Sequence, residues 1–364
     1  MYRMVVFMKL FLILIFSVFL GAAATGQKSV KSKKSLTTKA AVKNSGTAQK
    51  SNSPVALEEV KFKGENINLA GVLSFPKSSS PLPTVLVVPD YFSTRDGIPT
   101  LKGVHNSFRD LATHLNANGF AVLRYDRRCT GASECMANSA MANGVEDAYQ
   151  AVQYLKTRKE IDPKNIFVLG HGDGAILAAG IAAHPDLVGC IVVAAPGRNP
   201  SKLLRDWSRQ AMLDKKFPEA EIKKQMDRVE NVIIRMTEGG HQAADSVNDY
   251  SNEYLVELQK LPGYAFSWLL DDPLQVYPGI NGAALIVQGA KDRRVKTKDA
   301  VYVEDSLKVG EHKDFEAHQL PNFDYFMKEN KGEATPASDY EFSRPLDPAF
   351  LKLLDGWLAK KIKK

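Results

Sequence analysis

The five residues Gly170-His171-Gly172-Asp173-Gly174 have the spacing of a nucleophile turn whose nucleophile is missing. They follow an apolar run at residues 166–169 and precede a helical pattern that begins at Ala175. In a Gly-x-Ser-x-Gly turn, the central serine carries the reactive hydroxyl on a strained strand-to-helix bend. Gly172 stands at that centre. Because glycine accepts positive φ, it can keep the bend while removing the hydroxyl.

The elements around this turn predict a mostly parallel, doubly wound α/β sheet. An alternating pattern from Val60 to Leu73 predicts an opening antiparallel hairpin. Continuous apolar runs then alternate with helical patterns, as expected when helices cover both faces of a sheet. The predicted strands are 84–88, 121–125, 166–169, 188–194, 284–288 and 315–320, and the predicted helices are about 108–118, 145–158, 298–307 and 348–360. From about residue 200 to 278 only helical spacing remains, which predicts an inserted helical cap.

The start of the chain predicts export. Arg3 and Lys9 precede an apolar run at 10–20 and the small residues Ala22-Ala23-Ala24, the pattern of a secretory signal peptide cut near Ala24. We therefore expect residues 1–24 to be a signal peptide and the protein to be periplasmic or extracellular.

A lysine- and serine-rich segment at 25–55 follows, with no aromatic or acidic residue, and we expect a disordered linker. Its seven lysines and the two cations of the leader carry nine positive charges, so the formal +7 of the chain becomes −2 for the folded domain at 56–364. The basic balance therefore belongs to the leader and the linker and does not indicate nucleic-acid binding by the folded domain, and we expect no nucleic-acid partner. The linker could contact an anionic envelope surface, although a solvated spacer is the simpler interpretation.

Five short strings carry a family resemblance: 123–128 (Leu-Arg-Tyr-Asp-Arg-Arg), 162–165 (Asp-Pro-Lys-Asn), the turn at 170–174, 288–292 (Gln-Gly-Ala-Lys-Asp) and 320–323 (Leu-Pro-Asn-Phe). In this order and spacing they resemble the α/β-hydrolase fold, over roughly residues 57–362. More narrowly, the chain is similar to exported serine esterases of the dienelactone-hydrolase and prolyl-peptidase-like branch. The resemblance implies carboxylic ester chemistry, with no cofactor and no metal.

Carried over by position, the resemblance implies a degenerate catalytic triad. The family places a serine at Gly172, an acid at Asp292 and a histidine at Tyr325, so only the acid is retained. The glycine-rich turn that helps to build the oxyanion hole reads Pro89-Asp90-Tyr91-Phe92 here, which leaves the Asp173 amide as one donor. Loss of the nucleophile or base costs on the order of 10⁶ in turnover. We therefore expect a protein without serine-hydrolase activity that binds an unknown small-molecule, ester-like ligand or a partner through the former active-site pocket.

The alternative is an active carboxylic ester hydrolase with another nucleophile. Cys129 replaces a glycine near the pocket, and Arg127 and Arg128 could lower its pKa. A disulfide with Cys135 or an ordinary thiol is the favoured interpretation. Cys190, in an apolar strand, is expected to be an inert core thiol.

The histidines offer no evident replacement for the lost base. His171 lies beside the bend and is expected to pack there, whereas His318 falls inside a strand, too early for the base. His105 precedes the first helix, and we expect it to face solvent.

A further hypothesis concerns acidic residues at the ends of the strands. Five acids could converge on a cation: Asp90, Asp126, Asp173, Asp292 and Asp324. We favour the simpler arrangement, in which Asp126 and Asp292 pair with Arg95, Arg127 or Arg294, Asp173 caps a helix and the others face water.

The turn also matches a dinucleotide-binding fingerprint, Gly170-x-Gly172-x-x-Ala175. The match is weak because no acid follows the next strand.

Overall fold

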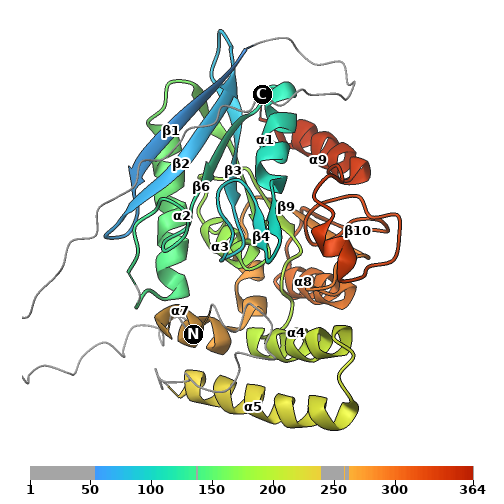
Figure 1. The fold of residues 1–364 in the computed structure, drawn as a ribbon. Helices are drawn as coiled ribbons and strands as arrows, with labels where there is room; N and C mark the ends of the chain where they lie inside the picture. Colours follow the sequence, from blue (N-terminus) through green and yellow to red (C-terminus); the bar gives the residue numbers. More distant parts are fainter. Residues whose placement is uncertain (1–53, 137, 239–257, 259–261, 364) are drawn as a thin grey trace, which may run out of the picture. The chain divides into compact units, whose positions relative to one another are not determined.

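The computed structural model describes residues 54–136, 138–238, 258 and 262–363 (Figure 1). The predicted signal peptide and the predicted linker as far as residue 53 lie outside the described residues. The first strand begins at Val55, the last residue assigned to the linker. No helix in the described part of the chain has the length and apolar composition needed to cross a membrane.

A mixed, mostly parallel sheet forms the framework, as the sequence predicts. Its eight strands lie in the order β1-β2-β6-β3-β7-β8-β9-β10. β1 and β2 form the predicted antiparallel hairpin, β2 pairs antiparallel with β6, and all further pairs are parallel. The bounds are β1 Val55–Lys63, β2 Asn68–Pro76, β3 Leu82–Val88, β6 Ala121–Tyr125, β7 Ile161–His171, β8 Gly189–Val193, β9 Ala283–Gly289 and β10 Phe315–Leu320.

Helices cover both faces of this sheet, and alternate strand residues explain why. In β3, Val85 and Val87 pack in one apolar cluster, whereas Leu86 and Val88 pack in the other. Successive side chains of a strand point to opposite faces, so a continuous apolar run requires cover on both sides. One face is covered by α1 (Ser107–Ala117) and α9 (Pro348–Lys361), and the other by α2 (Met141–Lys156), α3 (Gly174–Ile181) and α8 (Thr297–Val309). The predicted doubly wound architecture is therefore confirmed.

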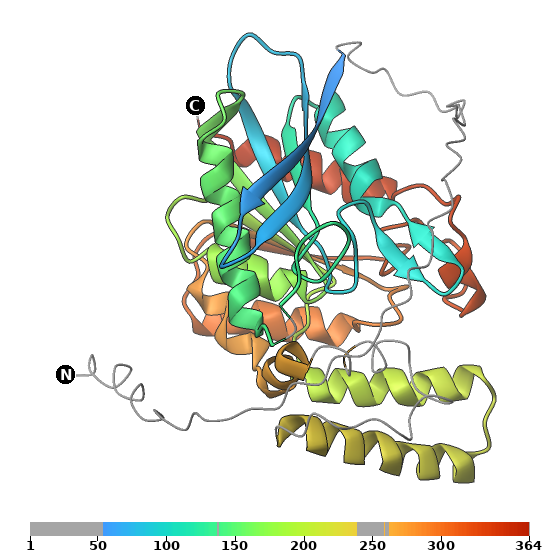
Figure 2. The same ribbon diagram turned by 60° about the vertical axis from the view of Figure 1, so that its left-hand side comes forward.

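Between β8 and β9 the chain forms helices instead of strands. α4 spans Pro200–Asp214, α5 spans Glu219–Thr237 and α7 spans Pro262–Leu270. α4 and α5 lie side by side in both views (Figures 1 and 2). Leu203, Val229 and their neighbours are buried at helical spacing. These helices are the inserted cap that the sequence predicts within this fold.

A short hairpin between β3 and α1 is not predicted from the sequence. It consists of β4 (Ile98–Thr100) and β5 (Gly103–His105), which pair antiparallel. Each strand has only three residues, which is too short to show an alternating pattern of apolar and polar side chains. The hairpin buries His105, and the expectation that this histidine faces solvent is therefore wrong.

Candidate active site

The bend between β7 and α3 has the backbone geometry of a nucleophile turn. Gly172 adopts φ +60°, and its amide donates to the Val193 carbonyl at 3.0 Å. Gly174 packs against the end of β3 so closely that an added Cβ would lie 2.4 Å from the Val88 carbonyl oxygen. Gly174 is therefore required by close backbone approach, whereas Gly172 adopts without strain the left-handed φ at which the family's serine is strained.

The space above Gly172 is filled by two other side chains. A Cβ placed on Gly172 would lie 2.6 Å from the Tyr325 hydroxyl oxygen and 2.8 Å from the Asp90 carboxyl carbon. Both distances are far below van der Waals contact. A side chain at position 172 is therefore incompatible with the present places of Asp90 and Tyr325.

Asp90 accepts hydrogen bonds in the manner of a bound oxyanion. Its Oδ1 accepts from the Tyr91 amide at 2.9 Å and from the Asp173 amide at 3.2 Å, and its Oδ2 accepts from the Tyr325 hydroxyl. One amide comes from the loop after β3 and the other from the residue after the turn's centre, the two positions that supply an oxyanion hole. The sequence alone indicates only the Asp173 amide. The structure has a second donor, Tyr91, and Asp90 engages both.

Asp173 forms a second buried carboxyl site beside Asp90. It accepts from Arg127 Nη1 at 3.0 Å, from the Tyr91 amide at 2.7 Å and from the Tyr264 hydroxyl of α7. The rings of Tyr264 and Tyr91 stack with centroids 3.7 Å apart, and the Arg127 guanidinium lies 4.6 Å from the Tyr91 ring. The cap therefore contacts the turn through Tyr264. Asp173 stands at the α3 N-cap position but makes no side-chain cap bond, so the predicted capping role is wrong.

Asp90 and Asp173 are two buried carboxyl groups whose pKa values are shifted in opposite directions. Burial raises the pKa of Asp173, and the adjacent Asp90 charge raises it further. Burial acts in the same direction on Asp90, but the hydrogen bonds from Asp173 and from Tyr325 leave the pKa of Asp90 below its ordinary value. The ionised form is therefore favoured more at Asp90 than at Asp173, and the Arg127 guanidinium is bound to the Asp173 side of the pair.

Asp292 lies at the end of β9 but does not contact Tyr325. It accepts from the backbone amides of Arg294 and Val295, at 2.7 and 2.9 Å, and from Gln288 Nε2 at 3.0 Å. The hydroxyl of Tyr325 donates to Asp90 instead. The predicted pairing of Asp292 with an arginine side chain is therefore wrong.

The other strand-end acids form separate pairs. Asp126 accepts from the Arg95 amide at 2.7 Å and lies 3.8 Å from its guanidinium, as predicted. Asp324 is buried against Arg344 at 2.6 Å, so the expectation that it faces water is wrong. Within the described ranges, no group of three or more His, Cys, Asp or Glu side chains could hold a metal ion.

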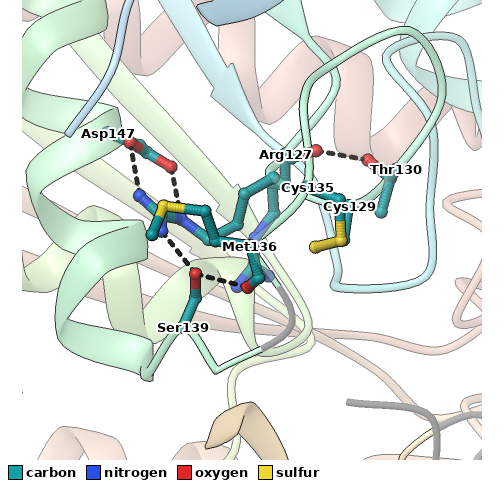
Figure 3. Close-up of a disulfide and its surroundings, with 8 residues drawn as sticks. Arg127, Cys129, Thr130, Cys135, Met136, Ser139 and Asp147 are labelled. Carbon is teal, nitrogen blue, oxygen red and sulfur yellow. Dashed lines mark hydrogen bonds and ion pairs between the residues drawn. A yellow bond between two sulfur atoms is a disulfide. The ribbon is translucent and has the colours of Figure 1, made fainter. Parts of the chain in front are cut away.

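Cys129 is joined to Cys135 by a disulfide, so it offers no thiolate nucleophile (Figure 3). The bond closes a short loop after β6, where Cys129 has φ +63°. The adjacent Arg128 donates from Nε to Asp147 at 2.7 Å and from Nη1 to Ser139 at 2.6 Å. The disulfide interpretation is therefore confirmed over the reactive-cysteine hypothesis.

The remaining candidates pack inside the protein. The Nε2–H of His171 donates to the Tyr325 carbonyl at 2.6 Å, and burial lowers the pKa of His171 to about 4, so the ring is neutral near pH 7. His105 lies between the rings of Phe326 and Phe342. Cys190 is a buried thiol, and burial raises its pKa. A dinucleotide phosphate would need the Asp173 amide at the start of α3 as a donor. This amide already donates to Asp90, which argues against the dinucleotide hypothesis.

Known proteins to which this chain is similar include esterases and members of a peptidase family. Residues 103–322 match the serine aminopeptidase S33 family. Esterase EstD of Thermotoga maritima is 23% identical over 305 residues, which are 83% of this chain and 68% of that protein. The Pyrococcus furiosus esterase PF2001 superimposes with a TM-score of 0.55 at 17% identity, covering 85% of this chain and 91% of that one. Est1E of Butyrivibrio proteoclasticus with ferulic acid bound has a TM-score of 0.55 at 14% identity, covering 84% and 100%.

The sheet order, the strained turn and the cap, together with these structural neighbours, define an α/β-hydrolase fold. The family match covers more than half of the chain. This protein therefore belongs to the serine aminopeptidase S33 family, within the esterase-like α/β hydrolases that its sequence resembles.

Removing Arg127 should strongly destabilise the protein. The Arg127→Met substitution leaves the Asp90–Asp173 pair with a buried, unbalanced charge, and we expect a loss of about 3–5 kcal/mol in the free energy of unfolding, measured in urea. Arg127→Met combined with Asp90→Asn should recover part of this loss, because the second change removes the charge. The matched control is Arg209→Met at the exposed Arg209–Glu219 pair, expected to cost less than about 1 kcal/mol. A similar small cost for Arg127→Met would contradict this account.

Asp292 should make stability fall as pH rises. Burial raises its pKa to about 7 in the folded protein, against an ordinary 3.8, so the stabilising protonated form is present at low pH and is lost as pH rises through about 7. Asp292→Asn removes this dependence. The variant should gain stability relative to the natural protein between about pH 5 and about pH 8, by no more than about 1.4 kcal/mol per pH unit. An identical stability difference at both pH values would show that Asp292 does not titrate in this range.

The disulfide should contribute stability. Cys129 and Cys135 are six residues apart, and closing such a short loop restricts the unfolded chain by about 2 kcal/mol. We expect Cys129→Ser with Cys135→Ser to lower the free energy of unfolding by about that amount, and dithiothreitol to have the same effect on the natural protein. Alkylation by iodoacetamide of the natural, unreduced protein at position 129, detected by mass spectrometry, would show that the bond is absent.

Proposed function

We propose that this protein is an exported, catalytically silent member of the esterase-like family that binds a ligand or partner around its former active site. One observation carries the proposal: the Asp90 carboxylate occupies both oxyanion-hole amides above a glycine that has no nucleophile. An ester substrate needs these amides free when charge develops on its carbonyl oxygen. Here that place already holds a negative charge from the protein itself.

The residue at the base position supports the same conclusion. Burial raises the pKa of Tyr325 well above its ordinary value, and the protonated hydroxyl donates a hydrogen bond to Asp90. A general base must accept a proton near the working pH. Nucleophile, base and oxyanion hole act as a unit, and loss of the nucleophile or base alone costs on the order of 10⁶ in turnover.

Export rests on the leader pattern of residues 1–24 and is supported by the Cys129–Cys135 bond. Disulfides persist in oxidising compartments and are rare in the cytosol. The proposed location is the periplasm or the cell exterior, with the lysine-rich segment at 25–55 available to an anionic envelope surface.

An active esterase with another nucleophile is the second candidate function. The similarity to Esterase EstD over 83% of the chain favours it. The disulfide removes the nucleophile that the sequence suggested for this candidate, Cys129. Ester hydrolysis by the natural protein would favour this second candidate.

A set of reverted variants tests the proposal with p-nitrophenyl acetate. We expect no turnover above buffer from the natural protein or from Gly172→Ser with Tyr325→His, because Asp90 still fills the oxyanion hole and the space of the serine. Adding Asp90→Gly should give turnover about 10²–10³-fold above the buffer rate, the effect typical of oxyanion-hole donors.

The matched control is the triple variant with Gly172→Ala in place of Gly172→Ser, which adds the Cβ without the hydroxyl and should be inactive. Circular dichroism verifies that each variant is folded. Turnover by the natural protein overturns the proposal. Equal activity of the double and triple variants contradicts the role given to Asp90.

A further inference from the structure

Arg294 presents an unpaired guanidinium beside the turn. Its guanidinium carbon lies 4.6 Å from the centre of the Tyr325 ring and 5.5 Å from that of Phe326, and the residue is half-buried. Among the described residues, no carboxylate lies within 4.0 Å of this guanidinium and none of its N–H groups has a hydrogen-bond acceptor. The adjacent Arg293, by contrast, pairs with Asp214 and with Asp339.

The backbone of Arg294 is held from both the core and the cap. Its amide donates to Asp292 at 2.7 Å, and its carbonyl accepts from the Trp207 indole of α4 at 2.5 Å. The position of the side chain is therefore fixed without use of its own donors. A guanidinium carries five N–H donors in a planar fork, and the rings of Tyr325 and Phe326 lie within cation–π distance of this one.

The nearby carboxylates keep Arg294 charged but do not bind it. Burial disfavours its charge, yet Tyr325, Asp90 and other acids raise its pKa above the ordinary value. Asp90 and Asp292 already accept at least three hydrogen bonds each. Arg294 thus remains a cation with unused donors next to the family's catalytic centre.

We propose that Arg294 binds the carboxylate of an organic acid beside the filled oxyanion hole. The proposal rests on the proposed function and gives its ligand a chemical class. A planar guanidinium matches a carboxylate with two parallel hydrogen bonds, which a neutral ester or amide cannot reproduce at the same strength. Tyr325 and Phe326 are themselves buried, so recognition rests on the carboxylate of the acid and not on its apolar part.

Fluorine NMR of 4-fluorobenzoate, titrated with the protein, tests this site. We expect the natural protein to bind 4-fluorobenzoate and not 4-fluorobenzamide, and Arg294→Gln to weaken binding at least about tenfold, equivalent to about 1.4 kcal/mol. Arg294→Lys keeps the charge without the fork and should bind with intermediate strength. Arg109→Gln, at an exposed arginine of α1, is the matched control and should bind normally.

Three outcomes overturn the inference: no binding of 4-fluorobenzoate, equal binding by folded Arg294→Gln, or equally tight binding of inorganic phosphate. If Arg294→Gln does not fold, unchanged binding by Arg294→Lys overturns the role of the fork. The same samples are assayed with p-nitrophenyl acetate. Ester turnover by the natural protein contradicts the proposed function. A natural protein that neither hydrolyses the ester nor binds 4-fluorobenzoate contradicts only the carboxylate site.

Discussion

Two backbone amides, those of Tyr91 and Asp173, converge on one oxygen of Asp90, and this interaction sets the composition of the whole centre. The carboxylate is buried, so it must be fully hydrogen-bonded, and Tyr325 supplies the donor for its second oxygen. The two groups together leave no room for a Cβ at position 172. The aspartate, the glycine and the tyrosine therefore depend on one another, and none can revert to the family's residue alone without a clash or an unpaired buried group.

The same centre connects the core to the cap. Asp173 receives Arg127 from the core and the Tyr264 hydroxyl from α7, while Tyr264 stacks on Tyr91. Because the Arg127 guanidinium is bound to Asp173 next to Asp90, the arrangement avoids the high cost of an isolated buried charge. Aromatic stacking adds a directional contact that fixes α7 against the turn. Oxyanion hole, carboxyl pair and cap contact are consecutive parts of one hydrogen-bonded network.

The sequence predicts the framework well because its signals are local. Runs such as 84–88 are apolar throughout, since both faces of β3 are buried, and Gly170 and Gly174 are required by the bend itself. It does not predict where the side chain of Asp90 points, because the decisive partner, Tyr325, lies 235 residues further along the chain. The sequence also does not predict that His105 is buried against Phe326 and Phe342, because these rings lie more than 200 residues further along the chain. Nor does it predict that Asp324 pairs with Arg344, because the loop that brings them together has no regular pattern.

The most direct test of the central interaction is a pair of high-resolution crystal structures, one of the natural protein and one of Asp90→Gly. We predict that the natural protein shows the Asp90 carboxylate bound to the amides of Tyr91 and Asp173. In the variant, both amides should be retained in place and should bind water or an anion instead. An Asp90 side chain turned away from these amides in the natural protein, with solvent already between them, would contradict the account.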